Sequence, residues 1–248
     1  MNKETDYCFV MPILPDKVDE AKQFWKEADP DELDKYMRAI GQSRVVEFIQ
    51  TLPRGKFLVT YVKEAEDLGT TFGKNRGQGS EIAAYVRDGF RRFTGIDFTE
   101  PGNTPNVEKI MAWEDTEIKE TERRCSAFAV PILPGKTNDV RHFFDEINNE
   151  MAGQKDTIFR YQTVSKIGSF LQYRPEGDYL VEYVESREPI GAVMRMGLST
   201  GTPLSEFIRK GFTGFSALPL PLAPDIELIF DWNAGKGYQS PAERTARA

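Results

Sequence analysis

Two glutamates lie where two predicted β-strands are otherwise apolar. Glu47 shares a strand face with Val45 and Ile49, and Glu182 lies within the apolar run 180–184. A carboxyl buried among apolar side chains has a raised pKa and can act as a general base near neutral pH. The alternative is that each carboxylate lies at a strand edge and reaches solvent. We take Glu47 and Glu182 as candidate catalytic residues.

Paired cations and aromatic rings provide candidate ligand-binding groups. Arg44 and Lys166 occupy matching positions at the starts of two predicted strands, where they could hold an acidic ligand. Solvated charges that flank the strands are the alternative. Large rings with polar tips can line a pocket or pack in a core. The candidates of this kind are Tyr61, Tyr183, Trp113 and Trp232.

The other chemistry-bearing residues argue against a metal or a cofactor. His142 is the single histidine, and helical spacing puts it opposite an apolar stripe, on the solvent side. That placement argues against a haem ligand, and one histidine does not make a Cys/His zinc site. The glycine-rich run 73–79 could hold an anion, with a flexible loop as the alternative. We expect no metal and no cofactor, so an enzyme here would use carboxylates, tyrosines, arginines or the reactivity of its substrate.

A repeated β-hairpin positions the candidate acids. Residues 44–63 and 166–185 have the same apolar and turn residues at the same spacing. In each turn a proline is followed two residues later by glycine, Gly55 or Gly177, which can take the positive φ that closes the hairpin. The repeat aligns Thr60 in the first copy with Glu182 in the second.

The elements around each hairpin also repeat in order. Each half is predicted as strand, helix, strand, strand, helix, strand, and MPILPDK at 11–17 recurs as VPILPGK at 130–136. Each unit of this kind leaves one apolar sheet face that a second unit can cover. We expect a first ferredoxin-like unit over 1–115, a linker over 116–123, a second unit over 124–234 and a disordered tail over 235–248.

The segments TLPRGKFLVTYVKEAEDLG and YRPEGDYLVEYVESREPIG resemble an uncharacterised family within the dimeric α/β-barrel superfamily. Asp178 fits the acidic turn position of that family, while Lys56 departs from it. The resemblance implies an α+β fold in which two tandem ferredoxin-like units close into one barrel within the chain. Members of the superfamily include cofactor-free monooxygenases, lactone isomerases, haem-binding enzymes and stress-responsive proteins, so the fold alone does not choose an activity.

Composition limits the classes of partner. The net charge is −7, which disfavours binding to phosphate backbones, and we expect no nucleic-acid partner. No apolar run reaches the roughly 18 residues of a membrane helix, and the N-terminus is polar, so we expect a cytoplasmic protein without a membrane partner. The two cysteines, Cys8 and Cys125, provide no disulfide framework.

Two functions remain open from the sequence. The first is a small-molecule-binding protein, with a metal-free, cofactor-independent activity of monooxygenase or isomerase type on an apolar or acidic compound. The alternative is a non-catalytic, stress-related or interaction module whose barrel is a packed core. Because both units lie in one chain, we expect a monomer of 28.2 kDa with an intramolecular barrel, or a further homodimer through outer surfaces.

Overall fold

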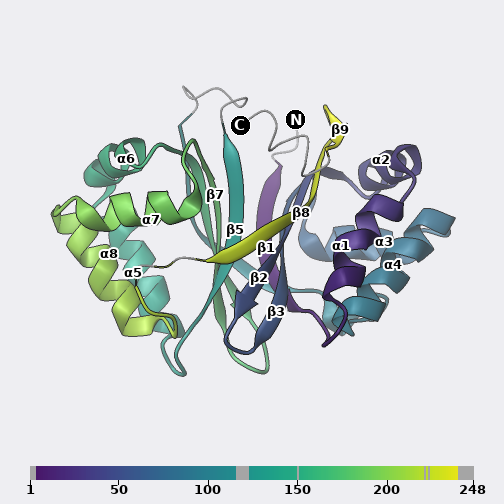
Figure 1. Ribbon diagram of the computed structural model, residues 1–248, viewed down its shortest axis with the longest axis horizontal. Helices are drawn as coiled ribbons and strands as arrows, with labels where there is room; N and C mark the ends of the chain where they lie inside the picture. Colours follow the sequence, from purple (N-terminus) through teal and green to yellow (C-terminus); the bar gives the residue numbers. More distant parts are fainter. Residues whose placement is uncertain (1–3, 116–122, 150, 221, 223, 240–248) are drawn as a thin grey trace. The chain divides into compact units, whose positions relative to one another are not determined.

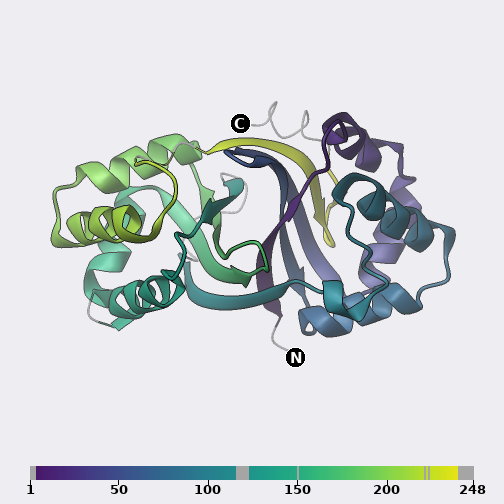
Figure 2. The same ribbon diagram turned by 90° about the horizontal axis from the view of Figure 1, so that it is seen from below.

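The computed structural model describes residues 4–115, 123–149, 151–220, 222 and 224–239. The chain divides into two compact units, one formed by the residues up to Asn106 and from Ile226, the other by Val107–Asp225. Each unit has one β-sheet whose helices lie on a single face (Figures 1 and 2). The α+β class with antiparallel hairpins, predicted from the repeat, is confirmed.

The first hairpin supplies β2 and β3 at the centre of the first unit's sheet, which has the order β1-β3-β2-β8-β9. Central β3 pairs antiparallel with both β1 and β2, which aligns Phe9, Thr60 and Glu47 across the sheet. The elements are β1 (Thr5–Pro12), α1 (Val18–Glu27), α2 (Pro30–Ala39), β2 (Gln42–Leu52), β3 (Gly55–Glu64), α3 (Leu68–Gly77), α4 (Glu81–Thr94), a 3-10 turn (Pro101–Asn103), β8 (Asp225–Asn233) and β9 (Gly237–Tyr238).

The second unit repeats this plan with the sheet order β4-β6-β7-β5. Its hairpin aligns Phe128, Glu182 and Ser169 in the same way. The elements are β4 (Asn106–Glu114), β5 (Arg124–Pro131), α5 (Thr137–Asn149), α6 (Ala152–Tyr161), β6 (Val164–Tyr173), β7 (Tyr179–Ser186), α7 (Ile190–Ser199) and α8 (Pro203–Phe215).

The last strand of each sequence half lies in the sheet of the other half. Strand β4 is the neighbour of β6, and β8 is the neighbour of β2. The backbone N–H of Asp115 accordingly donates to the carbonyl of Ser165 at 2.7 Å, and that of Ala234 donates to Ser43 at 3.0 Å. The compact units therefore differ from the expected ranges 1–115 and 124–234 by an exchange of their final strands.

Two further segments differ from expectation. The run 73–79, interpreted as an anion-binding or flexible loop, is mostly helix, because α3 begins after the N-cap Asp67, whose side chain accepts from the Thr70 N–H at 3.0 Å. The tail was expected to be disordered from residue 235, but Gly237 and Tyr238 pair with Asn233 and Trp232 as β9. Residues 116–122 of the expected linker and 240–248 of the tail lie outside the described residues.

Aromatic layers join the helices within each unit. Phe24 of α1 stacks on Tyr85 of α4 at 4.7 Å between centroids, and Phe143 of α5 stacks on Phe207 of α8 at 5.0 Å. A glycine lies under each pair: a Cβ at Gly89 would come within 2.0 Å of the Phe24 ring, and one at Gly211 within 2.4 Å of Phe143. These glycines therefore allow close helix–helix packing.

Local expectations from turn and surface chemistry are confirmed. The hairpin glycines have positive φ, 133° at Gly55 and 129° at Gly177. The His142 side chain is 78% exposed and its Nε2 lies 3.1 Å from Glu146. It thus lies on the solvent face of α5, as its helical spacing predicts.

Candidate functional site

Glu47 lies on the helix-facing side of the first sheet and is buried, with 1% exposure. The indole Nε1 of Trp25 donates to Glu47 Oε2 at 2.6 Å, and the Thr60 hydroxyl donates to Oε1 at 3.3 Å. Burial raises the pKa of the Glu47 carboxyl to about 7, although the two hydrogen bonds act in the opposite direction. The carboxyl can therefore exchange a proton near neutral pH, while its role as a catalytic residue stays a prediction.

Trp25 is placed by the packing of α1. Its neighbours Ala21 and Phe24 are buried on the same helix, so the apolar face of α1 turns the indole toward the sheet. The indole stacks on Phe230 of β8, with centroids 4.1 Å apart and planes at 22°. The Nε1–H is thereby aimed at Glu47 from an ordered ring.

Glu64, the last residue of β3, is a second buried carboxyl in the same unit, with 0% exposure. Gln42 Nε2 donates to its Oε1 at 3.2 Å. Burial raises its pKa to about 7, against the lowering effect of Gln42 and of the nearby Thr71 hydroxyl. Glu64 was not among the residues predicted from the sequence, although strand alternation puts it on the same face as Thr60.

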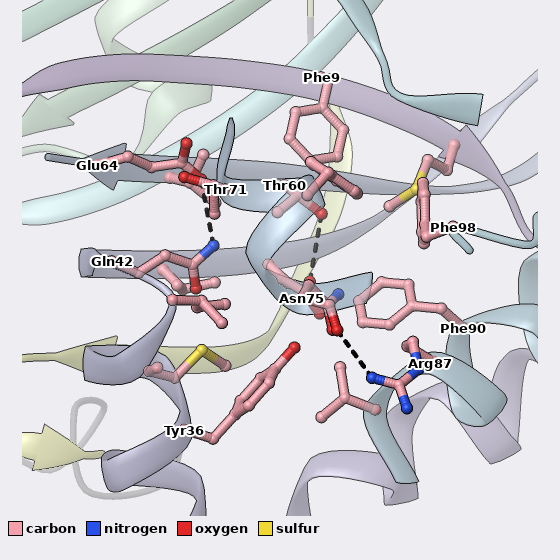
Figure 3. Close-up of a pocket in the computed structure, with 18 of the residues that line it drawn as sticks. Phe9, Tyr36, Gln42, Thr60, Glu64, Thr71, Asn75, Arg87, Phe90 and Phe98 are labelled. Carbon is pink, nitrogen blue, oxygen red and sulfur yellow. Dashed lines mark hydrogen bonds between the residues drawn. The ribbon is translucent and has the colours of Figure 1, made fainter. Parts of the chain in front are cut away.

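Both acids line a cavity of about 60 Å³ in the first unit. Figure 3 shows Glu64 and other residues of its wall. Strands β1–β3, helices α1–α4 and Phe98, which follows α4, supply its wall. The polar lining residues are Tyr36, Gln42, Glu47, Thr60, Glu64, Thr71, Asn75 and Arg87, among the rings of Phe9, Trp25, Phe72, Phe90 and Phe98. The cavity thus combines an aromatic wall with titratable groups, which is typical of small-molecule sites.

Exposure along the lining indicates where the cavity opens. Gln42, Phe72, Asn75 and Arg87 are half-buried, while the other lining residues are buried. Arg87 Nη1 donates to the backbone carbonyls of Asn75 and Gln78 at 2.8 and 2.9 Å. Glu47 therefore lies in the deep part of the cavity, and this half-buried group forms its entrance.

Tyr36 of α2 points its hydroxyl into the cavity (Figure 3). The side chain is buried, and burial raises the pKa of the phenol above its usual value although the Arg87 charge acts to lower it. Tyr36 therefore stays a neutral phenol at physiological pH and can donate a hydrogen bond.

Glu182, the second predicted catalytic residue, has a different setting in the second unit. Ser169 Oγ donates to Glu182 Oε2 at 2.9 Å, and burial raises the pKa of the carboxyl to about 8. The repeat of MPILPDK as VPILPGK aligns Phe144 with Trp25, so the position that supplies the indole donor in the first unit holds a phenylalanine here. Glu182 is buried but does not line the described cavity, and its catalytic role stays a prediction.

The predicted ligand-binding residues lie elsewhere than the cavity. Arg44 forms an ion pair with buried Asp231, and Lys166 Nζ lies 5.8 Å from the centroid of the Tyr183 ring. Tyr61 is on the opposite face of β3 from Thr60, because successive strand residues alternate. Their role in ligand binding stays a prediction.

The two predicted tryptophans, Trp113 and Trp232, use their indole groups in contacts within one unit. Trp113 Nε1 donates to Asp156 at 2.7 Å. Trp232 Nε1 donates to Asp34 at 3.1 Å, and the guanidinium of Arg38 lies 6.0 Å from the centroid of the Trp232 ring. Both rings thereby connect a sheet to a helix.

The described residues contain neither a metal cluster nor a membrane-spanning helix. Within residues 4–115, 123–149, 151–220, 222 and 224–239, no group of three or more His, Cys, Asp or Glu side chains is arranged to hold a metal ion. In the same part of the chain, no helix has both the length and the apolar character needed to cross a membrane.

Comparison with known proteins shows similarity in structure only. No family model matches the chain, and no curated protein matches its sequence. The fold is similar to a candidate monooxygenase of Fusobacterium nucleatum subsp. nucleatum ATCC 25586, at 10% identity over 96% of each chain with a TM-score of 0.50. A candidate monooxygenase of Lactobacillus acidophilus NCFM aligns at 9% identity and a TM-score of 0.46, over 92% of this chain and 93% of that one. An anthrone oxidase-like protein aligns at 12% identity and 0.48, over 95% of each. At these identities, the first likeness shows a shared fold and nothing about activity.

Proposed function

We propose that the first unit binds a small apolar compound with an acidic proton, such as a phenol or an enolisable ketone, and that Glu47 removes that proton. The observation that carries this proposal is a buried carboxyl with a pKa of about 7 on the wall of an aromatic cavity. A general base is most effective when its pKa lies near the working pH. The activity is of isomerase or monooxygenase type and uses no metal or cofactor.

The contacts of Glu47 suit it to proton transfer. The Trp25 and Thr60 donors fix the carboxylate and stabilise its charged form, while burial stabilises its neutral form. Burial outweighs the two hydrogen bonds and raises the pKa of the carboxyl to about 7, so both forms are accessible near pH 7. A carboxylate oxygen of Glu47 accepts the proton of the ligand, and the neutral Tyr36 hydroxyl is available as a donor to the anion that forms.

Two outcomes follow from the anion. In an isomerase, the Glu47 carboxyl returns the proton to another atom of the ligand. In a monooxygenase, the carbanion of a CH₂ group gives electrons to dioxygen, so that one oxygen atom becomes the carbonyl of the product and the other leaves as water with both hydrogens. The structural likeness to a candidate monooxygenase agrees with the second outcome but rests on fold alone.

The test is proton exchange on small carbon acids in D₂O. Cyclohexanone and acetophenone are incubated with the whole chain, and deuterium incorporation is followed by NMR while dioxygen consumption is recorded. We expect an exchange rate that rises with pH through about 7, because Glu47 is then ionised. Glu47→Gln is expected to lower the rate by about 100-fold or more, the usual contribution of a general base.

Glu182→Gln is the matched control, because it also removes a buried carboxyl with a raised pKa but does not touch the cavity. Its exchange rate is expected to equal that of the unmodified chain. Equal rates for Glu47→Gln and the unmodified chain would exclude Glu47 as the base.

A second candidate function is favoured by the size of the cavity. Its volume of about 60 Å³ is well below the roughly 300–1,000 Å³ of sites for drug-sized ligands, which agrees with a packed, non-catalytic module. Absence of both exchange and binding for all single-ring compounds would favour this alternative.

We also propose that the two units close into one barrel within a single chain, as the family resemblance implies. Light scattering on the intact chain tests this proposal. A mass of 28.2 kDa supports it, and an obligate larger assembly at every concentration counts against it.

A further inference from the structure

The entrance side of the cavity holds polar atoms that lack partners. Glu64 Oε2 and Thr71 Oγ1 are buried, and within the described part of the chain neither has a hydrogen-bond partner. Thr71 lies near enough to affect the pKa of Glu64, but the pair does not reach hydrogen-bond geometry. Asn75 Oδ1 is likewise buried and has no hydrogen-bond partner among the described residues. Burying a polar atom without a hydrogen-bond partner costs free energy. This end of the cavity is therefore suited to a ligand that supplies hydrogen-bond partners.

The chemistry of these atoms selects the type of ligand group. When Glu64 is ionised, its Oε2 is an acceptor like Asn75 Oδ1, and the Thr71 hydroxyl can accept as well as donate. A ligand group with N–H or O–H donors would satisfy them, whereas a carboxylate or phosphate would place acceptor against acceptor. Phe72 and Phe9 line the same cavity and provide ring surface for an aromatic ligand.

The two acids lie at opposite ends of one row of side chains. Thr60, which contacts Glu47, and Glu64 are four residues apart on β3 and face the same side. Their backbone positions are therefore separated by about 13 Å at the rise of a β-strand. A ligand in the cavity can thus direct one group toward Glu47 and another toward Glu64, near the entrance.

We propose that Glu64, Thr71 and Asn75 form a subsite for a hydrogen-bond donor, so that the ligand of this cavity is a small aromatic compound bearing a hydroxyl or ammonium group. The inference deepens the proposed function, on which it rests, by naming the class of compound. The donor group binds at the entrance side, and the acidic proton of the ligand lies deeper, beside Glu47. A protonated amine fits when Glu64 is ionised, and a hydroxyl fits either form of Glu64.

The experiment compares single-ring compounds of similar size by calorimetry with the whole chain. Phenol and benzylamine carry donors, toluene carries none, and benzoate is an acceptor-only anion. We expect phenol or benzylamine to bind at least about tenfold more tightly than toluene, the effect of one net hydrogen bond, and benzoate to bind most weakly. Phenol preferred at every pH identifies a hydroxyl ligand, and a preference for benzylamine that grows as pH rises through about 7 identifies an ammonium ligand.

Two variants locate the donor preference. Thr71→Val introduces the residue that the second unit has at this position, Val193, and Glu64→Gln retains the shape of the side chain. Each is expected to reduce the affinity for donor-bearing rings by about 5- to 30-fold and to leave that for toluene unchanged. Glu182→Gln, outside the cavity, is expected to change none of the affinities. Thermal unfolding of each variant confirms that it is folded.

Several results would overturn the subsite: toluene or benzoate binding as tightly as phenol and benzylamine, equal losses for all compounds in both variants, or binding of none of the four. A failure of the proposed function has a different signature. If Glu47→Gln leaves proton exchange unchanged while the Glu64 and Thr71 variants lose the donor preference, the base assignment is wrong and the subsite stands.

Discussion

Each unit buries a glutamate that is hydrogen-bonded to a hydroxyl across its hairpin, but the glutamate lies on a different strand in each. In the first hairpin a glutamate on β2, Glu47, faces a hydroxyl on β3, and in the second a serine on β6 faces a glutamate on β7, Glu182. Both carboxyls are buried and hydrogen-bonded to the residue opposite. The cross-strand pair is thus kept while the acid changes strand, which shows that the fold tolerates the buried acid on either strand of this pair.

The surroundings of the two acids differ more than the acids do. Four polar positions of the first-unit cavity align with apolar or small residues in the second unit, namely Gln42 with Val164, Glu64 with Ser186, Thr71 with Val193, and Asn75 with Gly197. Only Glu47 has an indole donor, from Trp25. The two units therefore share their arrangement of strands and helices, whereas the candidate site belongs to the first unit.

The largest expected difference between the units is in the pH dependence of stability. A carboxyl with a raised folded-state pKa favours folding while it is protonated, so its contribution is complete below pH 4.5 and is lost as pH rises through the folded pKa, about 7 for Glu47 and about 8 for Glu182. Replacement by glutamine removes this loss. Relative to the unmodified chain, stability should rise between these limits by on the order of 3 kcal/mol for Glu47→Gln and 5 kcal/mol for Glu182→Gln.

Urea unfolding from pH 4 to 9 measures this effect. The gain for Glu47→Gln should level off near pH 7 and that for Glu182→Gln near pH 8. Parallel curves for the variants and the unmodified chain would show that neither carboxyl has a raised pKa.

Replacing the helix-packing glycine should lower stability in both units. Gly89→Ala and Gly211→Ala place a methyl group against Phe24 or Phe143, and we expect each to destabilise by about 1–3 kcal/mol through overpacking, with Gly89 the more sensitive. Gly214→Ala on α8 is the control, since open space surrounds that position, and it should be neutral or slightly stabilising. Thermal denaturation compares the three, and equal effects would contradict the close-packing explanation.

Trp25→Phe gives Glu47 the phenylalanine neighbour that the second unit has at the aligned position, Phe144. The change removes the Nε1–H donor, so the pKa of Glu47 should rise from about 7 toward the value of about 8 for Glu182. The expected loss of stability is about 1 kcal/mol, that of one hydrogen bond. Carboxyl NMR titration measures the pKa, and an unchanged value would mean that burial alone sets it.

His142→Gln should have the smallest effect. The substitution copies Gln23 of the first unit at the aligned position of α1, and the His142 side chain is mostly exposed. We expect a change in the free energy of unfolding below about 0.5 kcal/mol. A larger loss in chemical denaturation would reveal a role for the contact with Glu146.

The candidate site could be predicted in part. Strand alternation alone indicated that Glu47 and Glu182 would be embedded among apolar residues, and both are buried. Glu64 escaped prediction because it ends its strand, where a charged residue usually reaches solvent. The donor Trp25 escaped as well, since it is 22 residues from Glu47 and reaches it only through the packing of α1 on the sheet.

The sequence by itself determined the repeated hairpins and the α+β class. These depend on local chemistry, such as the positive φ that Gly55 takes in its turn. Only the tertiary structure decided which sheet each final strand joins and where the cavity forms. Strands β4 and β8 have similar alternating patterns, so local preference fits either sheet, and a cavity depends on the joint packing of helices and strands that are distant in the chain.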